Sequence, residues 1–475
     1  MTLSRFLVAP ASLAGEPDPV TIAAVEAAAA RRDHAEGDVE LLVGMLEGDL
    51  ASQHAVETEL AREGLDRTVL GRDAFVERVR DAEARRRAEL VEALGAHDIS
   101  VDAEPGRTGG EANVRAARVA FVRLYDGGLL ERAERVVDVC SRCRTVVEPT
   151  DASALPTDVV RYTLRVADEA ATGPTVDVGL VELELLPGVV AVAVPVGHDA
   201  VNAIVRVPLG KEVPVIAEDD VEEPWFVVPA HDAVALDFAR RHNLVPVPVL
   251  DRDGAVIAEG AVCGLARFAA RAAATEIVAA EGAIVAEAEV SVDLMRCGRC
   301  ATPLVPVLGW HWFLRTADLE VAAADAIREG AVTLDDVEAR DRFVDRAERA
   351  DSWCLSHQVW AGDAVPAARC TDCGQVAVTA EPSSSCGKCM GELVSTDDVL
   401  DARFVAALWP LAHAGWPNDE RAAADAAPST VVFAGADDVT GFALPVAALG
   451  LRLAGAVPYG ELVCVRLTED QPEAS

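Results

Sequence analysis

The stretch VVDVCSRC at residues 136–143 ends in a Cys-x-x-Cys pair, and LMRCGRC at residues 294–300 ends in a second pair. Two residues between cysteines form a tight turn that lets both sulfurs reach one metal ion, and two such turns complete a tetrahedral zinc site. The segment between them, 144–296, is long enough to be a domain. A zinc ion shared by the two pairs would therefore fasten the neck of an inserted domain, whose two ends must lie close together.

Two further Cys-x-x-Cys pairs lie near each other, separated only by residues 374–385, and this spacing predicts a local zinc ribbon. Disulfides or free thiols are the alternative to zinc. Because a four-thiolate site has no open position, we expect both sites to hold architecture and to catalyse nothing. The predicted metal ligands are Cys140, Cys143, Cys297 and Cys300 in one site, and Cys370, Cys373, Cys386 and Cys389 in the other.

Composition indicates a globular protein with an unusually acidic surface. The chain has 475 residues, of which 51% are hydrophobic and 25% charged, with a formal net charge of −37. A surface this acidic repels nucleic-acid phosphates, so we expect a protein partner and no tRNA binding. No apolar run approaches the roughly 20 residues of a membrane helix, and the N-terminus does not resemble a signal peptide. Paired cysteines without such a signal favour a cytoplasmic protein that binds no membrane.

The pattern of apolar residues changes along the chain. Helical periodicity runs through 51–95 and 111–135, whereas 175–260 holds short Val-rich runs punctuated by Gly and Pro, which are typical of strands. Strand and helix patterns alternate at both ends of the chain. This order predicts an α/β fold in which a doubly wound parallel sheet is split by a β-rich insertion. The predicted parts are 1–143, 144–296, 297–427 with the ribbon at 370–389, and 428–475.

Several blocks of the sequence resemble one family. The chain is similar to the N-terminal half of a valyl-tRNA synthetase, a class I aminoacyl-tRNA synthetase, from about residue 5 to 470. The resemblance implies a Rossmann-type catalytic domain split by an editing domain, with zinc at the two places above. The blocks include ELAREGLDRTVLGRDAFVERV (59–79), PLGKEVPVIAEDDV (208–221), DSWCLSHQVWAGDAVPAARCTDCG (351–374) and DVLDARFVAALWPLAHAGWP (398–417).

The family's first signature, His-x-Gly-His, holds the ATP phosphates at a helix N-terminus. The corresponding stretch here, 9–25, retains Gly15 but has no histidine. An acid at the phosphate position adds repulsion where the reaction needs neutralisation. The four signature positions fall on Asp18, Pro19, Val20 and Thr21.

Two other family blocks keep their first glycine and lose most of their polar side chains. Gly-Thr-Asp-His-Ala-Gly, which lines the substrate pocket, falls on 44–49 and retains Gly44, and Gly-Phe-Asp falls on 435–437 and retains Gly435 and Asp437. The resemblance leaves Gly15, Gly44, Gly435 and Asp437 as degenerate nucleotide-binding positions. An acidic set, Asp18 with Glu47 and Asp49, offers an alternative site for Mg²⁺ or a cationic small molecule.

The family's last signature, Lys-Met-Ser-Lys-Ser, stabilises the departing pyrophosphate, and this sequence ends at TEDQPEAS where that loop would begin. The only lysines are Lys211 and Lys388, and neither is near. Losing a single oxyanion contact costs about 10²–10³ in rate, and here several such contacts are lost together. We therefore expect that the chain is not an ATP-dependent ligase. Relative to the family we also expect it to be truncated and to be without the anticodon-binding domain.

The editing insert has lost most of its family residues as well. The region that surrounds the misacylated ester reads LELLPGVV at 183–190. His231, Asp232 and Asp237 are the remaining candidate catalytic residues, since a His-Asp pair beside an acid can position water. The alternative is that VPAHD forms a buried turn whose His and Asp satisfy backbone groups.

The sequence therefore predicts a synthetase-like pseudoenzyme with two structural zinc ions that acts in binding or regulation. Two enzymatic alternatives stay open. In the first, the chain would activate an amino acid with ATP and Mg²⁺ in a rebuilt pocket. In the second, the inserted domain would hydrolyse aminoacyl esters. A third alternative is a companion of a full-length synthetase without any small-molecule ligand.

Overall fold

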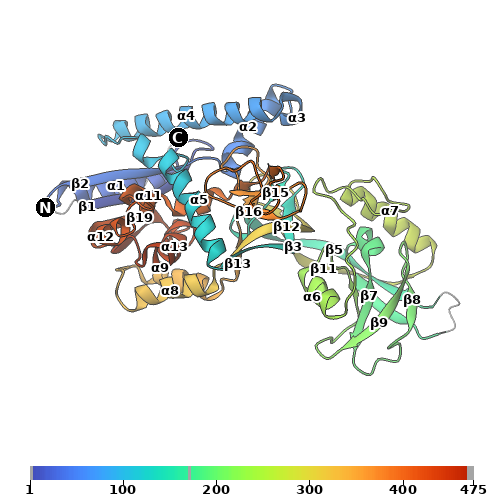
Figure 1. Cartoon of the computed structure of the whole chain (residues 1–475). Helices are drawn as coiled ribbons and strands as arrows, with labels where there is room; N and C mark the ends of the chain where they lie inside the picture. Colours follow the sequence, from blue (N-terminus) through green and yellow to red (C-terminus); the bar gives the residue numbers. More distant parts are fainter. Residues whose placement is uncertain (1–3, 169–172, 468–475) are drawn as a thin grey trace. The chain divides into compact units, whose positions relative to one another are not determined.

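The computed structural model describes residues 4–168 and 173–467, which divide into two compact units (Figure 1). The first unit combines Met1–Arg132 with Trp312–Ser475, and the second is Ala133–His311. Strand β3 (Leu130–Cys140) carries the chain out of the first unit and strand β12 (Val305–Arg315) brings it back. The insertion predicted for 144–296 lies inside the second unit.

The first unit is built on a parallel sheet in the order β2-β1-β19-β20. Strands β1 (Ser4–Ser12) and β2 (Val39–Leu46) come from the start of the chain, and β19 (Thr430–Gly435) and β20 (Glu461–Val465) come from its end. Every neighbouring pair in this sheet is parallel, with Phe6 opposite Val431 and Leu41. The split Rossmann-type sheet that the sequence predicts is therefore present.

Alternation along β1 gives this sheet two buried faces. Phe6 and Val8 belong to a core with α1 (Pro19–Asp33) and the end of α4 (Arg72–Ala96). Leu7 and Ala9 belong to a larger core on the other face. This larger core is completed by α5 (Glu111–Asp126), α8 (Ala317–Arg328), α9 (Val337–Glu348), α10 (Ala402–Ala407), α11 (Trp409–Ala414) and α13 (Leu444–Ala454). Side chains that alternate across a fully covered strand explain its continuous apolar run.

The remaining elements of the first unit are short. They are α2 (Leu50–Arg62), α3 (Arg67–Leu70), β13 (Ser352–Cys354), β14 (Ser356–His357), β15 (Ala367–Cys370), β16 (Val376–Val378), β17 (Leu393–Ser395), β18 (Val399–Leu400), α12 (Ala422–Ala426) and a π-helical turn, η5 (Val439–Ala443). Strands β16, β15 and β17 form the three-stranded sheet of the predicted ribbon.

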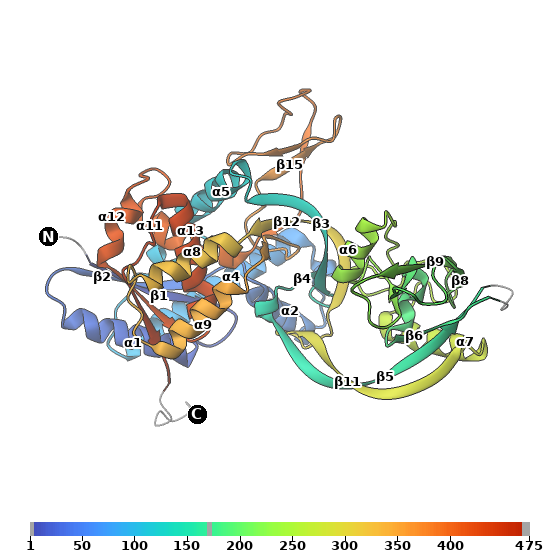
Figure 2. The same cartoon turned by 90° about the horizontal axis from the view of Figure 1, so that it is seen from below.

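The second unit is β-rich, as the Val-rich runs predict. Strands β10 (Trp225–Val227), β7 (Ala191–Pro195), β9 (Glu212–Glu218) and β8 (Ile204–Arg206) form one sheet in that order. Strands β5 (Ala152–Val166) and β11 (Ile284–Cys297) run antiparallel over almost their whole length and curve side by side in Figure 2. The second unit also contains β4 (Thr145–Val146), β6 (Val176–Leu180), the 3₁₀ segment η3 (Leu183–Gly188), α6 (Ala233–Arg241) and α7 (Arg267–Ala280).

One sequence-based expectation about a helix was wrong in extent. Helical periodicity over 111–135 ends at Asp126, because Gly128 adopts φ of 70° and the following residues join β3. A π-helical turn, Val439–Ala443, precedes α13, which begins at Leu444.

Candidate metal centres and the remodelled catalytic cleft

All four Cys-x-x-Cys turns have the same backbone conformation. In each, the residue after the second cysteine has a positive φ, and its N–H donates to the carbonyl of the first cysteine. These residues are Arg144 (φ 57°, 2.7 Å), Ala301 (φ 55°, 2.8 Å), Gly374 (φ 71°, 3.1 Å) and Met390 (φ 62°, 2.8 Å). Only one of the four is glycine, so three side chains hold a left-handed conformation that non-glycine residues rarely adopt. A repeated strained turn at each cysteine pair indicates a ligand-holding knuckle.

The knuckles bring the eight cysteines into two groups of four, as predicted. In each group the sulfur atoms lie within 4.8 Å of one another. In the second unit, Cys140 Sγ lies 3.4 Å and Cys143 Sγ 3.7 Å from Cys300 Sγ, and the neck strands β3 and β11 end there. In the ribbon, Cys370 Sγ lies 3.4 Å from Cys389 Sγ. Four thiolates at tetrahedral spacing are a donor set that can hold a metal ion.

Acids lie at the end of the parallel sheet where the family resemblance places the ATP phosphates. Gly15 lies in the loop between β1 and α1, and Asp18 caps α1 by accepting a hydrogen bond of 3.2 Å from the Val20 N–H. A side chain at Gly435 would place its Cβ 2.7 Å from Val20 Cγ1. Beyond Gly435, burial together with the charges of Asp437 and Asp18 raises the pKa of Asp438 to about 6. The helix N-terminus that would meet phosphates is therefore surrounded by carboxyl groups.

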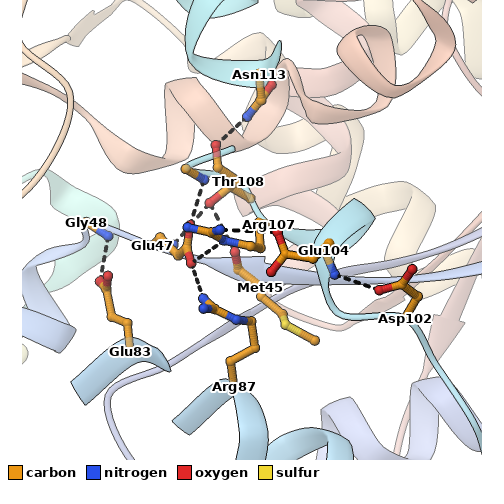
Figure 3. A network of polar contacts seen from close by, with 11 residues as sticks. Met45, Glu47, Gly48, Glu83, Arg87, Asp102, Glu104, Arg107, Thr108 and Asn113 are labelled. Carbon is orange, nitrogen blue, oxygen red and sulfur yellow. Dashed lines mark hydrogen bonds and ion pairs between the residues drawn. The ribbon is translucent and has the colours of Figure 1, made fainter. Parts of the chain in front are cut away.

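The predicted acidic set of Asp18, Glu47 and Asp49 does not converge on one cation site, because each member is engaged elsewhere. Asp49 caps α2 by accepting from the Ser52 N–H at 2.8 Å and also accepts from Ser12 Oγ at 3.1 Å. Glu47 binds two arginines, Arg87 and Arg107, as Figure 3 shows. Gly44 keeps a packing role, since its Cβ would lie 2.8 Å from Pro10 on β1.

A pocket of about 190 Å³ opens beside Glu47 at the carboxyl end of β2. Its lining comes from the β2 end, helix α4, the loop before α5 and the segment after Trp360, and includes Glu47, Gly48, Arg80, Glu83, Arg87, Arg107, Gly109, Ala361, Gly362 and Asp363. Glu83 Oε1 accepts a hydrogen bond of 2.7 Å from the Gly48 N–H, visible in Figure 3. Burial raises the pKa of Glu83 to about 7, and burial also raises the pKa of Asp363.

Sequence reasoning did not find this pocket, although one signal for it was present. Arg80, Glu83 and Arg87 are spaced three and four apart, so they share one face of helix α4. That spacing resembles an ordinary solvated helix face. Only the structure shows that Glu83 is 6% exposed and faces Gly48 from another element.

The tryptophans of the family block at 351–374, Trp353 and Trp360, serve packing. Trp360 stacks edge-on with Phe75 at 5.5 Å between ring centroids, and the Arg67 guanidinium lies 4.9 Å from its ring centroid. The backbone N–H of Trp360 donates to Gln53 Oε1 at 2.7 Å. Trp353 Nε1 donates to the buried Asp401 at 2.8 Å.

In the second unit, His231 and Asp232 satisfy backbone groups. His231 Nε2 accepts from the Val249 N–H at 2.9 Å and the Leu250 N–H at 3.2 Å. Nδ1 must therefore carry the proton, which it donates to the Pro306 carbonyl at 2.6 Å. Burial lowers the pKa of His231, in keeping with a neutral ring. With both ring nitrogens engaged, the imidazole has no lone pair left for activating water.

The two acids of this candidate set are also occupied or remote. Asp232 caps helix α6 by accepting from the Ala235 N–H at 2.6 Å. Asp237 is exposed and pairs with Arg240 at 3.5 Å on the same helix. Where the editing motif would lie, Glu184 is fully buried and accepts from Arg267 Nε at 3.1 Å and Arg271 Nε at 2.8 Å. These contacts are those expected of a structural core.

Comparisons with known proteins agree with the fold. Valine–tRNA ligase of Solibacter usitatus is 29% identical over 449 residues, which cover 90% of this chain and 52% of that protein. Valine–tRNA ligase of Geobacter sulfurreducens is 31% identical over 434 residues (89% and 49%), and that of Streptomyces coelicolor is 30% identical over 447 residues (90% and 50%). The chain thus spans about half the length of the curated relatives it matches.

Within residues 4–168 and 173–467, no helix combines the length and apolar character needed to cross a membrane. The profile of the family described as tRNA synthetases class I (I, L, M and V) matches residues 25–472. This match covers strands β2, β19 and β20 of the parallel sheet, the β-rich unit and both cysteine clusters. The chain therefore belongs to the class I tRNA synthetase family, and its curated relatives are valine–tRNA ligases.

Proposed function

We propose that this chain is a class I synthetase-like protein that does not activate an amino acid and that acts instead in binding or regulation. The observation that carries the proposal is the acidic N-terminus of α1. Asp18 and Asp437 lie close enough to Asp438 to raise its pKa, and Asp438 is itself buried. Three carboxyl groups thus take the place where an adenylating enzyme neutralises phosphate charge.

The electrostatic argument has a clear direction. A triphosphate carries several negative charges, and its binding to a helix N-terminus depends on free N–H groups and a positive local field. Here the side chain of Asp18 already accepts from the Val20 N–H. ATP would have to displace that bond and approach Asp438 as well, and like charges at contact distance disfavour each other.

We further propose that both cysteine clusters hold zinc. The reducing environment expected for a chain with paired thiols, the Cys₄ donor set and the repeated knuckle support zinc over disulfides. The cysteines would hold the neck of the inserted unit and the ribbon, and the metal would supply only architecture because four thiolates leave no open position.

We propose that the acidic surface of this chain binds a protein partner. The formal net charge of −37 opposes tRNA binding, because each phosphate contact needs a local cation. A cytoplasmic location accords with thiol-bound zinc. The partner would present a complementary basic surface, since such complementarity speeds association and selects the register of the complex.

Amino-acid-dependent ATP–pyrophosphate exchange tests the proposal directly. The zinc-loaded chain would be assayed with each of the twenty amino acids, beside a Streptomyces coelicolor valine–tRNA ligase as the positive control. We expect no exchange above the enzyme-free background. Exchange with valine would refute the proposal, and exchange with another amino acid would show a repurposed activating enzyme. An Asp18→Asn, Asp438→Asn double variant, which removes two of the acids, would show whether they alone exclude ATP.

A further inference from the structure

We propose that the pocket at the carboxyl end of β2 binds a small organic cation, an amine or a guanidinium, between Glu83 and Asp363. All the lining residues belong to the first unit. The proposal goes beyond the loss of adenylation and does not depend on it, because the pocket is formed by side chains rather than by the retained glycines of the nucleotide-binding end.

The positive charges within the pocket are largely neutralised already. Glu47 accepts from Arg87 Nη1 and from Arg107 Nε, the latter at 3.0 Å, and from the Gly109 N–H at 3.1 Å. Arg107 also reaches Glu104 at 3.3 Å. Figure 3 shows the two guanidinium groups meeting at Glu47 from opposite sides. These arginines are fixed to protein carboxylates and offer little to an incoming anion.

Two acids of the pocket, in contrast, form no ion pair among the described residues. Within the described residues, Glu83 has a single hydrogen bond, from the Gly48 N–H, and forms no ion pair. Asp363 also lines the pocket, and its carboxylate forms neither a hydrogen bond nor an ion pair with any residue that the structure describes. Glu83 is 6% exposed and has one hydrogen bond for its two carboxylate oxygens, while the half-buried Asp363 carboxylate has none. A buried carboxyl group that is incompletely hydrogen-bonded is costly, so Glu83 beside Asp363 indicates a missing donor at this pocket.

Arg80 does not supply that donor. It is exposed, so water solvates its charge, and neither it nor Arg118 comes within ion-pair distance of Asp363 in the described structure. Lys and Arg are also scarce in the chain as a whole, at 42 residues against 79 acids. The overall field therefore concentrates small cations near the protein surface rather than anions.

Protonation gives the proposal a measurable signature. Burial, with Glu47 and Asp49, raises the pKa of Glu83 to about 7, while Arg87 acts in the opposite direction. Burial and Glu47 raise the pKa of Asp363, opposed by Arg118 and Arg80. A bound cation favours the ionised carboxylates, so binding releases protons near neutral pH. Affinity must then increase as the pH rises from 6 to 8.

Isothermal titration calorimetry of the full chain with agmatine and putrescine, at pH 6 and pH 8, tests the proposal. We expect binding that is tighter at pH 8, with a heat that depends on the ionisation enthalpy of the buffer. Glu83→Gln and Asp363→Asn should each weaken binding by about 10- to 100-fold, the usual effect of losing a hydrogen bond to a charged group. Glu77→Gln and Asp81→Asn, exposed acids on the same helix, are the matched controls and should leave affinity unchanged.

Three results would contradict the proposed cation site. Absence of heat with both cations at pH 8, tighter binding of inorganic phosphate or glutamate than of the cations, or equal loss in the control variants would each overturn the proposal. Glu83→Gln retains an oxygen acceptor for Gly48, so we expect it to fold, and thermal melting verifies this. If either variant fails to fold, the pH dependence and proton release of the unmodified chain decide the question.

Discussion

Replacing Glu184 by alanine should open the second unit locally, because this carboxylate occupies the position of the family's editing motif as a structural ion. Its side chain is 0% exposed and accepts three hydrogen bonds, at 3.1 Å from Arg267 and at 2.8 and 2.7 Å from Arg271. The Arg267 side chain is only 7% exposed. Glu184→Ala would therefore leave a buried guanidinium with Glu182 and the Leu304 carbonyl as its remaining partners.

The magnitude follows from the type of contact that is lost. Removing one partner of a buried ion pair costs roughly 3–5 kcal/mol, since the other charge stays buried without full compensation. With about 1.4 kcal/mol for each factor of ten, the equilibrium for local opening should rise by about 10²- to 4 × 10³-fold. Glu184→Gln keeps one oxygen acceptor and the side-chain shape, and we expect a smaller loss.

Hydrogen exchange measured by mass spectrometry resolves this effect without assuming one transition for the whole chain. Peptides that cover η3 and α7 should lose protection, while peptides from the parallel sheet of the first unit should not change. Glu287→Ala on β11 is the matched control, because Glu287 is exposed, and it should change stability by less than about 0.5 kcal/mol. A loss under about 1 kcal/mol in Glu184→Ala would refute the structural interpretation and restore a role for Glu184 in a ligand site.

Four further predictions concern the metal centres and individual side chains. Elemental analysis should find two zinc ions per chain, and Cys143→Ser or Cys373→Ser should each lower the content by one; an unchanged content would contradict the two-site assignment. His231→Ala should destabilise the second unit by about 2–4 kcal/mol, since it orphans two buried N–H groups, and should leave any aminoacyl-ester hydrolysis unaltered. Burial lowers the folded-state pKa of His231, so the contribution of the neutral ring to stability is present above the unfolded pKa of about 6.5 and is lost as the pH falls. Urea unfolding of the unmodified chain and of His231→Gln, measured over a series of pH values, checks this. The same pH slope in both proteins would contradict it. Asp438 has a raised pKa of about 6, so its contribution is present below the unfolded pKa of about 4 and lost as pH rises through 6; Asp438→Asn should stabilise the chain by about 2–3 kcal/mol at pH 7.5 and not at pH 4.

The architecture could be predicted from the sequence because its signals are local and redundant. Each Cys-x-x-Cys pair specifies a knuckle by itself, and the switch from helical periodicity to Val-rich runs marks the β-rich unit independently. Apolar runs such as VVFAG at 431–435 are bounded by turn residues and become the buried strand β19. The helix expected over 111–135 was too long, because periodicity continued past Gly127 and Gly128 although the backbone there had already turned.

The pocket could not be predicted, because its identity depends on pairings between distant residues. Glu47 was assigned to a cation site from its neighbours in the sequence, yet its partners Arg87 and Arg107 lie 40 and 60 positions away. Once these arginines neutralise Glu47, the unpaired acids become Glu83 and Asp363, which no local pattern distinguishes from the many solvated acids of this chain. Charge pairing of this kind is a tertiary property, and only the folded structure reveals it.

One rule connects the retained scaffold with the lost chemistry. At nearly every family site position that is still polar, the side chain now serves the fold: Asp49 and Asp232 cap helices, His231 joins three backbone groups, and Trp360 packs on Phe75. A polar group whose hydrogen bonds are all made within the protein has nothing left to offer a substrate. Glu83 and Asp363 depart from this rule, since both line a pocket, the buried Glu83 has only the hydrogen bond from Gly48, and the half-buried Asp363 carboxylate has none among the described residues. A carboxylate with hydrogen-bonding capacity left over at a pocket can still accept from a ligand, so the proposed cation site is the place where this chain retains chemistry to offer.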